Sequence, residues 1–169
     1  MNHVAFGMQP VQVAMTTIGP TLVFPASVRE AVLDQHRELR ALMQAVTDAC
    51  AREPLTRAPD GERFVRMIRD LHRCFDAHLD FEERELGPVL AIVDHWGPER
   101  LRAMHEDHAR QRAQLAALLE GTHAGWQGEQ LTIVVRGLVS ELARDMDDEE
   151  CGCLDARLLG AQCLDIERR

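Results

Sequence analysis

The feature that most constrains the fold is a helical repeat of hydrophobic residues in four long segments. Apolar side chains return every three or four residues over about 28–52, 62–94, 98–119 and 129–159. This period places them on one face of an α-helix. Short connections that contain Pro or Gly favour antiparallel neighbours, and Gly87–Pro88 predicts an irregular turn late in the second helix. The pattern therefore predicts an all-α protein, an antiparallel up-down-up-down four-helix bundle.

The composition agrees with a helical globular domain. Aromatic residues make up 4% of the 169 residues and Tyr is absent, which disfavours a sheet. The net charge of −9 disfavours a surface for nucleic acid or for an anionic membrane. Apolar runs stay shorter than the roughly 18 residues of a membrane span. The first basic residue is Arg29, so the start lacks the positive region of a secretory signal. We therefore expect a cytoplasmic protein with no nucleic-acid or membrane partner.

The first 27 residues have a different character. They show no helical period and contain five chain breakers, Gly7, Pro10, Gly19, Pro20 and Pro25. We expect an irregular N-terminal arm at 1–27 that packs over the bundle or stays mobile, and a bundle domain at 28–169. The arm is also the expected contact for a protein partner, if there is one. Ser27 is expected to be the N-cap of the first helix, with Glu30 completing a capping box.

Six polar residues interrupt the hydrophobic faces of the four helices: His36, His78, Glu82, His108, Asp145 and Glu149. A spacing of four residues places His78 with Glu82, and Asp145 with Glu149, on one inward face. Counted from the connecting turns, the six lie at similar heights, within one or two helical turns. Each isolated buried charge would cost several kcal/mol, so a positive ion is expected among them.

The donor set indicates which ions would bind. A single one of these histidines would more often be a hydrogen-bonded core residue, and a single carboxylate would more often pair with Arg. Six in register instead favour two divalent cations joined by bridging carboxylates. Carboxylate oxygen with imidazole nitrogen suits iron, manganese or zinc.

The motif around His78 resembles a known family signature. The segment His78-Leu-Asp-Phe-Glu82-Glu83-Arg-Glu-Leu86-Gly-Pro88 is similar to the HxxxEExxLxP signature of hemerythrin-like domains, also called HHE cation-binding domains. His36 resembles the ligand of that family's first helix, and His108 resembles the ligand of its third. The likeness spans about 28–158. It implies a four-helix bundle with a non-heme di-iron centre.

The sequence departs from the family at two positions. The fourth helix should repeat the second, but it has Asp145 where a His is expected before Glu149. Met104 stands at the earlier place of a HxxxH pair that oxygen carriers have in the third helix. His72 and His105, near the edges of the hydrophobic faces, are alternatives for the missing ligand.

This donor set shapes the functional expectation. Extra anionic oxygen favours the ferric state, which argues against reversible oxygen carriage. We expect a carboxylate-bridged pair of iron ions that senses or reacts with oxygen, peroxide or NO, with zinc or manganese as other occupants. The alternatives are a regulatory interaction module stabilised by one ion without turnover, iron storage, and iron–sulfur repair.

The five cysteines indicate no disulfide framework. Cys50 and Cys74 fall within helical patterns, where we expect small buried side chains. Cys151, Cys153 and Cys163 lie near the end of the chain, as free thiols or as a redox pair or soft-metal site.

Overall fold

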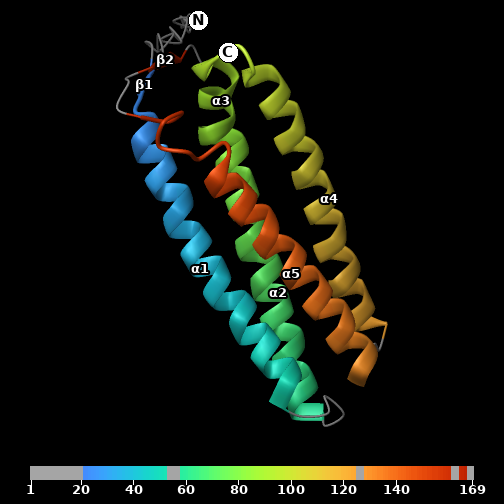
Figure 1. The fold of residues 1–169 in the computed structure, drawn as a ribbon. Coiled ribbons are helices and arrows are strands. Elements are labelled where there is room, and N and C mark those ends of the chain that lie inside the picture. Colours follow the sequence, from blue (N-terminus) through green and yellow to red (C-terminus); the bar gives the residue numbers. More distant parts are fainter. Residues whose placement is uncertain (1–20, 53–57, 125–127, 161–163, 167–169) are drawn as a thin grey trace, which may run out of the picture.

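The computed structural model describes residues 21–52, 58–124, 128–160 and 164–166. The helices are α1 (Pro25–Arg52), α2 (Ala58–Phe81), α3 (Gly87–Val93), α4 (Gly97–His123) and α5 (Gly128–Cys151). A π-helical turn, η1 (Glu82–Leu86), joins α2 to α3. Two short strands, β1 (Thr21–Val23) and β2 (Leu164–Ile166), form an antiparallel pair. Figure 1 shows the long helices α1, α2, α4 and α5 side by side and antiparallel, with α3 continuing α2 through η1, so the predicted bundle is confirmed.

Each of the long helices α1, α2, α4 and α5 packs against two of the others, which closes the bundle. α1 packs against α2 and α5, and α4 packs against the same two helices from the opposite side. In the part of the chain that the structure describes, no helix is long and apolar enough to cross a membrane.

Some helix ends differ from those expected. α1 begins at Pro25, and the N–H of Ser27 donates to the carbonyl of Phe24 at 2.9 Å. Ser27 is therefore inside the first turn, and its prediction as the N-cap was wrong. α5 ends at Cys151 rather than near Leu159, because hydrogen-bonded turns follow Gly152. Of the predicted arm, residues 1–20 lie outside the described residues.

The irregularity expected at Gly87–Pro88 takes the form of the π turn. Pro88 has no N–H, and its ring would collide with the carbonyl four residues earlier in a straight α-helix. The N–H of Gly87 instead donates to the carbonyl of Glu82, five residues back. One extra residue is thereby accommodated without ending the helix, as in π bulges at functional sites. The widened turn carries Glu82 itself.

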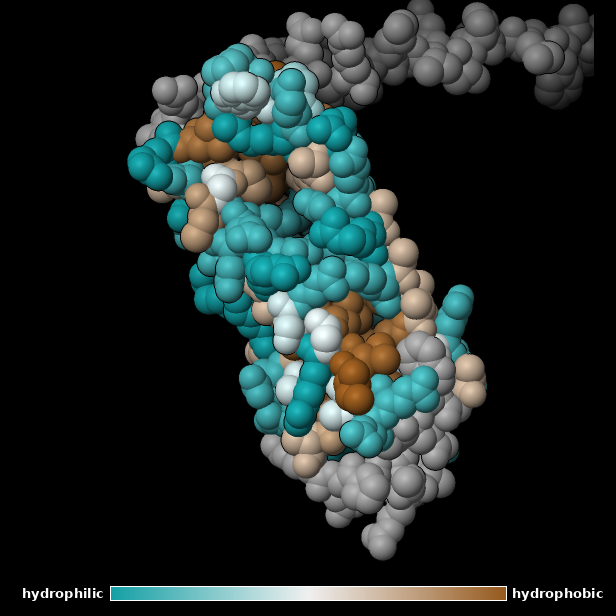
Figure 2. Space-filling view, turned by 45° about the vertical axis from the view of Figure 1, so that its right-hand side comes forward, coloured by the Kyte–Doolittle hydropathy of each residue, from teal (hydrophilic) through white to brown (hydrophobic). Residues whose placement is uncertain are grey.

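The core consists of two hydrophobic clusters with a polar layer between them. Leu39, Phe75 and Leu142 belong to one cluster, and Val32 and Leu86 belong to the other. His36 lies between Val32 and Leu39 in α1, and Glu82 precedes Leu86. On the face turned forward in Figure 2, hydrophilic residues cover the middle, and hydrophobic residues gather above and below. The polar layer is closed at both ends by apolar side chains.

Candidate metal centre

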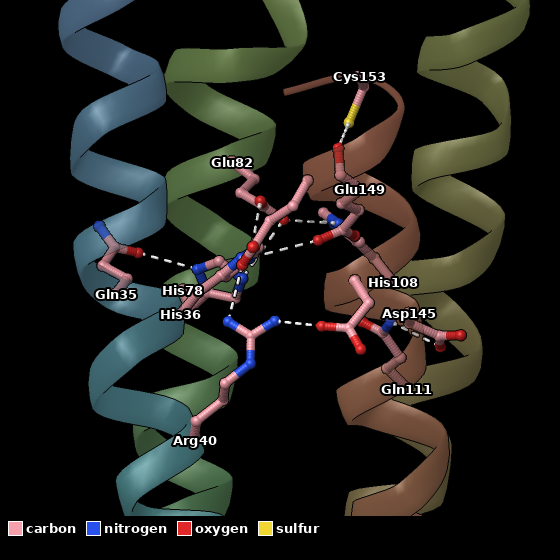
Figure 3. A network of polar contacts seen from close by, with 12 residues as sticks. Gln35, His36, Arg40, His78, Glu82, His108, Gln111, Asp145, Glu149 and Cys153 are labelled. Carbon is pink, nitrogen blue, oxygen red and sulfur yellow. Dashed lines mark hydrogen bonds and ion pairs between the residues drawn. The ribbon is translucent and has the colours of Figure 1, made fainter. Parts of the chain in front are cut away.

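Four predicted ligands converge in this polar layer. His36 from α1, His78 from α2, Glu82 from η1 and Glu149 from α5 each offer a ligand atom, and these atoms lie within 4.8 Å of one another. His36, His78 and Glu82 are buried, and Glu149 is partly exposed. Figure 3 shows the imidazoles of His36 and His78 turned toward Glu82. Such a set of side chains is able to hold a metal ion.

Glu82 is at the middle of the group. Its Oε1 lies 3.9 Å from Nε2 of His36, and its Oε2 lies 3.6 Å from Nε2 of His78. His108, from α4, places its Nε2 only 3.1 Å from the same Oε2. Nε2 of His36 is also 3.3 Å from Oε2 of Glu149. Three helices therefore aim the same ring nitrogen at one buried carboxylate.

Four of the buried atoms that face the middle of the group lack hydrogen-bond partners. They are Nε2 of His36, Nε2 of His108 and both carboxylate oxygens of Glu82. Buried polar atoms are almost always paired, because an unpaired one loses its hydration without compensation. A cation among these atoms would bind all of them, so the residues present fit a metal.

Each histidine of the group is oriented by a partner on its other ring nitrogen. The Nδ1 contacts are all 2.9 Å long: Glu150 for His36, Gln35 for His78 and Glu83 for His108. Such partners fix the tautomer and leave Nε2 free for a metal. The three rings differ, however, because two face a carboxylate and the third faces an amide.

Two arginines hold the carboxylates that orient the histidines. Nη1 of Arg40 donates to Glu150 at 2.7 Å, and Nη1 of Arg112 donates to Glu83 at 2.6 Å. These arginines keep the pKa of Glu83 and Glu150 below the ordinary value, although burial acts in the opposite direction. Both carboxylates are therefore charged at neutral pH.

The protonation of the imidazoles follows from these surroundings. Burial lowers the pKa of His36, but Glu149 and Glu150 raise it by more, and the net shift is upward. His108 behaves in the same way, with Glu82 and Glu83 opposing burial. For His78, burial prevails and lowers the pKa to about 4, which leaves the ring neutral and able to bind a metal at pH 7.

The sixth predicted ligand, Asp145, is engaged elsewhere. Its Oδ2 accepts hydrogen bonds from Nε2 of Gln111 at 3.1 Å and from Nη2 of Arg110 at 3.2 Å. Figure 3 shows Asp145 and Gln111 together, below Glu149 and away from His36 and His78. The structure thus brings five of the six predicted residues together and leaves Asp145 on the α4 side.

The other candidates for the missing histidine position are outside the group. His72 is half-buried in α2. His105 is exposed on α4 and lines a separate cavity with Pro98 and Glu106.

The orienting residues were not predicted from the sequence, although signals for them exist. Glu83 and Glu150 are the second members of the two Glu-Glu pairs. Arg40 and Arg112 each follow a ligand histidine by four residues, which is one helical turn. Gln35 has no comparable signal.

The described cysteines are all free thiols. Cys50 is buried as predicted, Cys74 is partly buried, and Cys151 is exposed. Cys153 is partly buried, its Sγ lies 3.7 Å from the carbonyl of Glu149, and burial raises its pKa to about 12. Cys163 lies outside the described residues.

Fold and site together define a helical-bundle protein with a buried cation-binding centre. A family model, the hemerythrin HHE cation binding domain, matches residues 27–152, which is most of the chain. The chain therefore belongs to the hemerythrin HHE cation-binding family. No curated protein and no solved structure matches it.

Proposed function

We propose that the protein holds two iron ions in this centre and senses or reacts with oxygen, peroxide or NO. The observation that carries the proposal is the position of Glu82. Its two oxygens face different imidazoles, with His36 beside Oε1 and with His78 and His108 beside Oε2. A buried carboxylate with donors on both sides is suited to bridge two cations.

The remaining donors complete the proposed ligand set. His36, His78 and His108 would hold the ions through Nε2, together with the carboxylates of Glu82 and Glu149. Asp145 is proposed as the sixth ligand, for which its carboxylate would have to turn away from Gln111 and Arg110. Mixed oxygen and imidazole donors suit iron, with manganese or zinc as other occupants. Bound iron would supply one-electron redox chemistry.

The chain itself would contribute orientation and exclusion of water. The two hydrophobic clusters cover the centre above and below, and the Nδ1 partners hold the rings in place. A dry surrounding strengthens the electrostatic interactions of the buried charges.

The metal content of protein purified from iron-rich cells tests the proposal. We expect two irons per chain, an oxo-to-iron band in the near ultraviolet, and two anomalous peaks at the iron edge beside Glu82. The variant Glu82→Ala should lose the iron. The control Glu106→Ala, at an exposed residue of α4 that pairs with Arg102, should keep it. Less than one iron per chain in the unchanged protein would contradict the proposal.

A second candidate is a regulatory module that holds one ion without turnover. It is favoured by the compactness of His36, His78, Glu82 and Glu149, which form a complete ligand set without His108 and Asp145. One ion per chain in the natural protein, rising to two in Asp145→His, would support this candidate over the di-iron one.

A further inference from the structure

The outward face of α4 carries a second regular pattern, on the side of the helix turned away from the buried Met104 and Leu118. Its residues alternate in spacing between three and four: Glu99, Arg102, Glu106, Ala109, Ala113, Ala116, Glu120 and His123. All of them are exposed except Ala116, which is partly buried. The same alternation marks the seam along which one helix packs on another. In Figure 1, α4 forms one edge of the bundle, so this face is turned away from the other helices.

A surface hollow lies on this face. It has a volume of about 480 Å³, and the residues that line it are Pro98, Leu101, Arg102, His105, Glu106 and Ala109. Beyond it along the helix, Ala113 and Ala116 present only methyl groups. Helices pack with their axes 8–10 Å apart, at a distance set by the side chains at the contact, so a face with small residues in its middle suits a close neighbour.

The charges along the face indicate which neighbour fits, because the face is complementary to itself in reverse. We consider a second copy of α4 that lies antiparallel, with a twofold axis level with Gln111. Ala109 then lies opposite Ala113 of the second copy. Arg102 and Glu120, which are both nine residues from Gln111, lie opposite each other. Twofold symmetry forms each of these pairs twice.

The other positions of the face agree with this register. Glu99 lies opposite His123 of the second copy, and an imidazole N–H can donate to a carboxylate. Glu106 lies opposite Ala116, and it keeps the 2.6 Å hydrogen bond from Nη1 of Arg102 in its own helix. The register therefore places alanine against alanine near the axis and brings no like charges of the face together.

Arg110 is the charged residue next to the axis, at the edge of the face. Two copies of it would come near each other in this arrangement. Its guanidinium is already balanced, because Nη1 donates to Asp107 at 2.5 Å and Nη2 donates to Asp145 at 3.2 Å. Arg110 therefore does not oppose the approach of a second copy.

We propose that the outward face of α4 is an interface at which two copies of this chain pack antiparallel, in the register that pairs Arg102 with Glu120. A surface that is complementary to itself is what a twofold interface requires. This inference concerns the assembly of the chain and goes beyond the proposed function, because it does not depend on the ions in the centre.

Charge reversal tests the interface and its register together. Arg102→Glu and Glu120→Arg, each made alone, place like charges opposite each other twice in the dimer. We expect each to raise the dissociation constant of the dimer by on the order of tenfold, since exposed pairs contribute modestly and each change counts twice. Sedimentation equilibrium of the full chain measures this constant. An ionic strength of about 0.15 M screens the repulsion between two chains of net charge −9.

A mixture of the two single variants separates contacts between chains from effects within one chain. In the mixture, the acidic position 102 of one variant faces the basic position 120 of the other, and the reverse holds for the second pair. We therefore expect the equimolar mixture, and the double variant on its own, to dimerise as the natural protein does. The control Arg66→Glu changes an exposed arginine of α2 that also pairs with a glutamate four residues away, Glu62, and should leave the dissociation constant unchanged.

Ala113→Glu provides a test at the middle of the face. It would bury a carboxylate against Ala109 of the second copy, so we expect a monomer with the helix content of the natural protein by circular dichroism. Three results would overturn the inference: a natural protein that sediments as a monomer at about 100 μM, a range in which even weak interfaces associate, a dimer that Ala113→Glu leaves intact, or single variants that are folded but do not dimerise when mixed.

Discussion

His36 and His108 stand in equivalent surroundings in the two halves of the bundle. The Nδ1 of each is hydrogen-bonded to the second glutamate of a Glu-Glu pair. An arginine four residues after the histidine donates a hydrogen bond to the same glutamate. The first glutamate of each pair, Glu82 or Glu149, belongs to the ligand group. The repeated residues of the two halves thus supply both the ligands and the groups that orient them.

Removing an orienting carboxylate should weaken metal binding without removing a ligand. We expect Glu150→Ala to lower the affinity for iron about 10–100-fold, as loss of such partners usually does. The ring of His36 would no longer be fixed, and Arg40 would lose one of its two carboxylate partners. Competition with a chelator of known affinity measures the change. Glu150→Gln, which keeps an oxygen acceptor, should recover part of it, and an affinity equal to that of the natural protein in Glu150→Ala would contradict the role.

The sequence predicted which polar residues lie on the inward faces of the helices better than it predicted the contacts that each of them makes. Polar residues on an otherwise apolar helical face could be found by spacing alone, and His36, His78, Glu82, His108 and Glu149 do come together. The surroundings of Asp145 could not be foreseen, because Gln111 and Arg110 reach it from another helix. Contacts between helices depend on rotation and register, and a single chain's periodicity does not fix either to within one residue.

At the scale of elements, the close approach of α3 and α4 depends on Gly97. A Cβ there would overlap the backbone carbonyl of Leu90 and the backbone of Ala91, which cannot yield as a flexible side chain would. We expect Gly97→Ala to lower the free energy of unfolding by roughly 1–3 kcal/mol. Chemical denaturation measures this loss. Gly137→Ala is the control, because its Cβ would meet no atom within 4 Å. Equal stability of Gly97→Ala and the natural protein would contradict the steric reason.

Helix ends and the π turn show where periodicity stops being informative. The hydrophobic pattern continues through Leu154 and Leu159, which are both buried, although α5 has ended at Cys151. Turns after Gly152 keep both leucines in the core, so the helix predicted to continue to about Leu159 was wrong although this segment is buried. Pro88 indicated an irregular turn, but the i−5 hydrogen bond from Gly87 to Glu82 was needed to define it.

At the scale of the molecule, the polar layer is expected to lower the stability of the folded chain when no metal is bound. It separates two hydrophobic clusters and leaves both oxygens of Glu82 without a hydrogen-bond partner inside the bundle. A cation that binds only the folded chain stabilises it by about 2.7 kcal/mol when its free concentration is a hundred times Kd. The metal should therefore control the stability of the whole bundle as well as its chemistry.

Removal of the metal by a chelator should accordingly lower the Tm by on the order of 10 °C, for a chain of this length. Calorimetry before and after dialysis measures the difference, and readdition of iron should restore it. Glu82→Leu separates the two contributions, because it removes the buried charge together with a proposed bridging ligand. We expect this variant to melt at the same temperature with or without iron, and above the metal-free natural protein, since an apolar side chain relieves the unpaired carboxylate. A variant that melts below the metal-free natural protein would show that Glu82 is satisfied there without a cation.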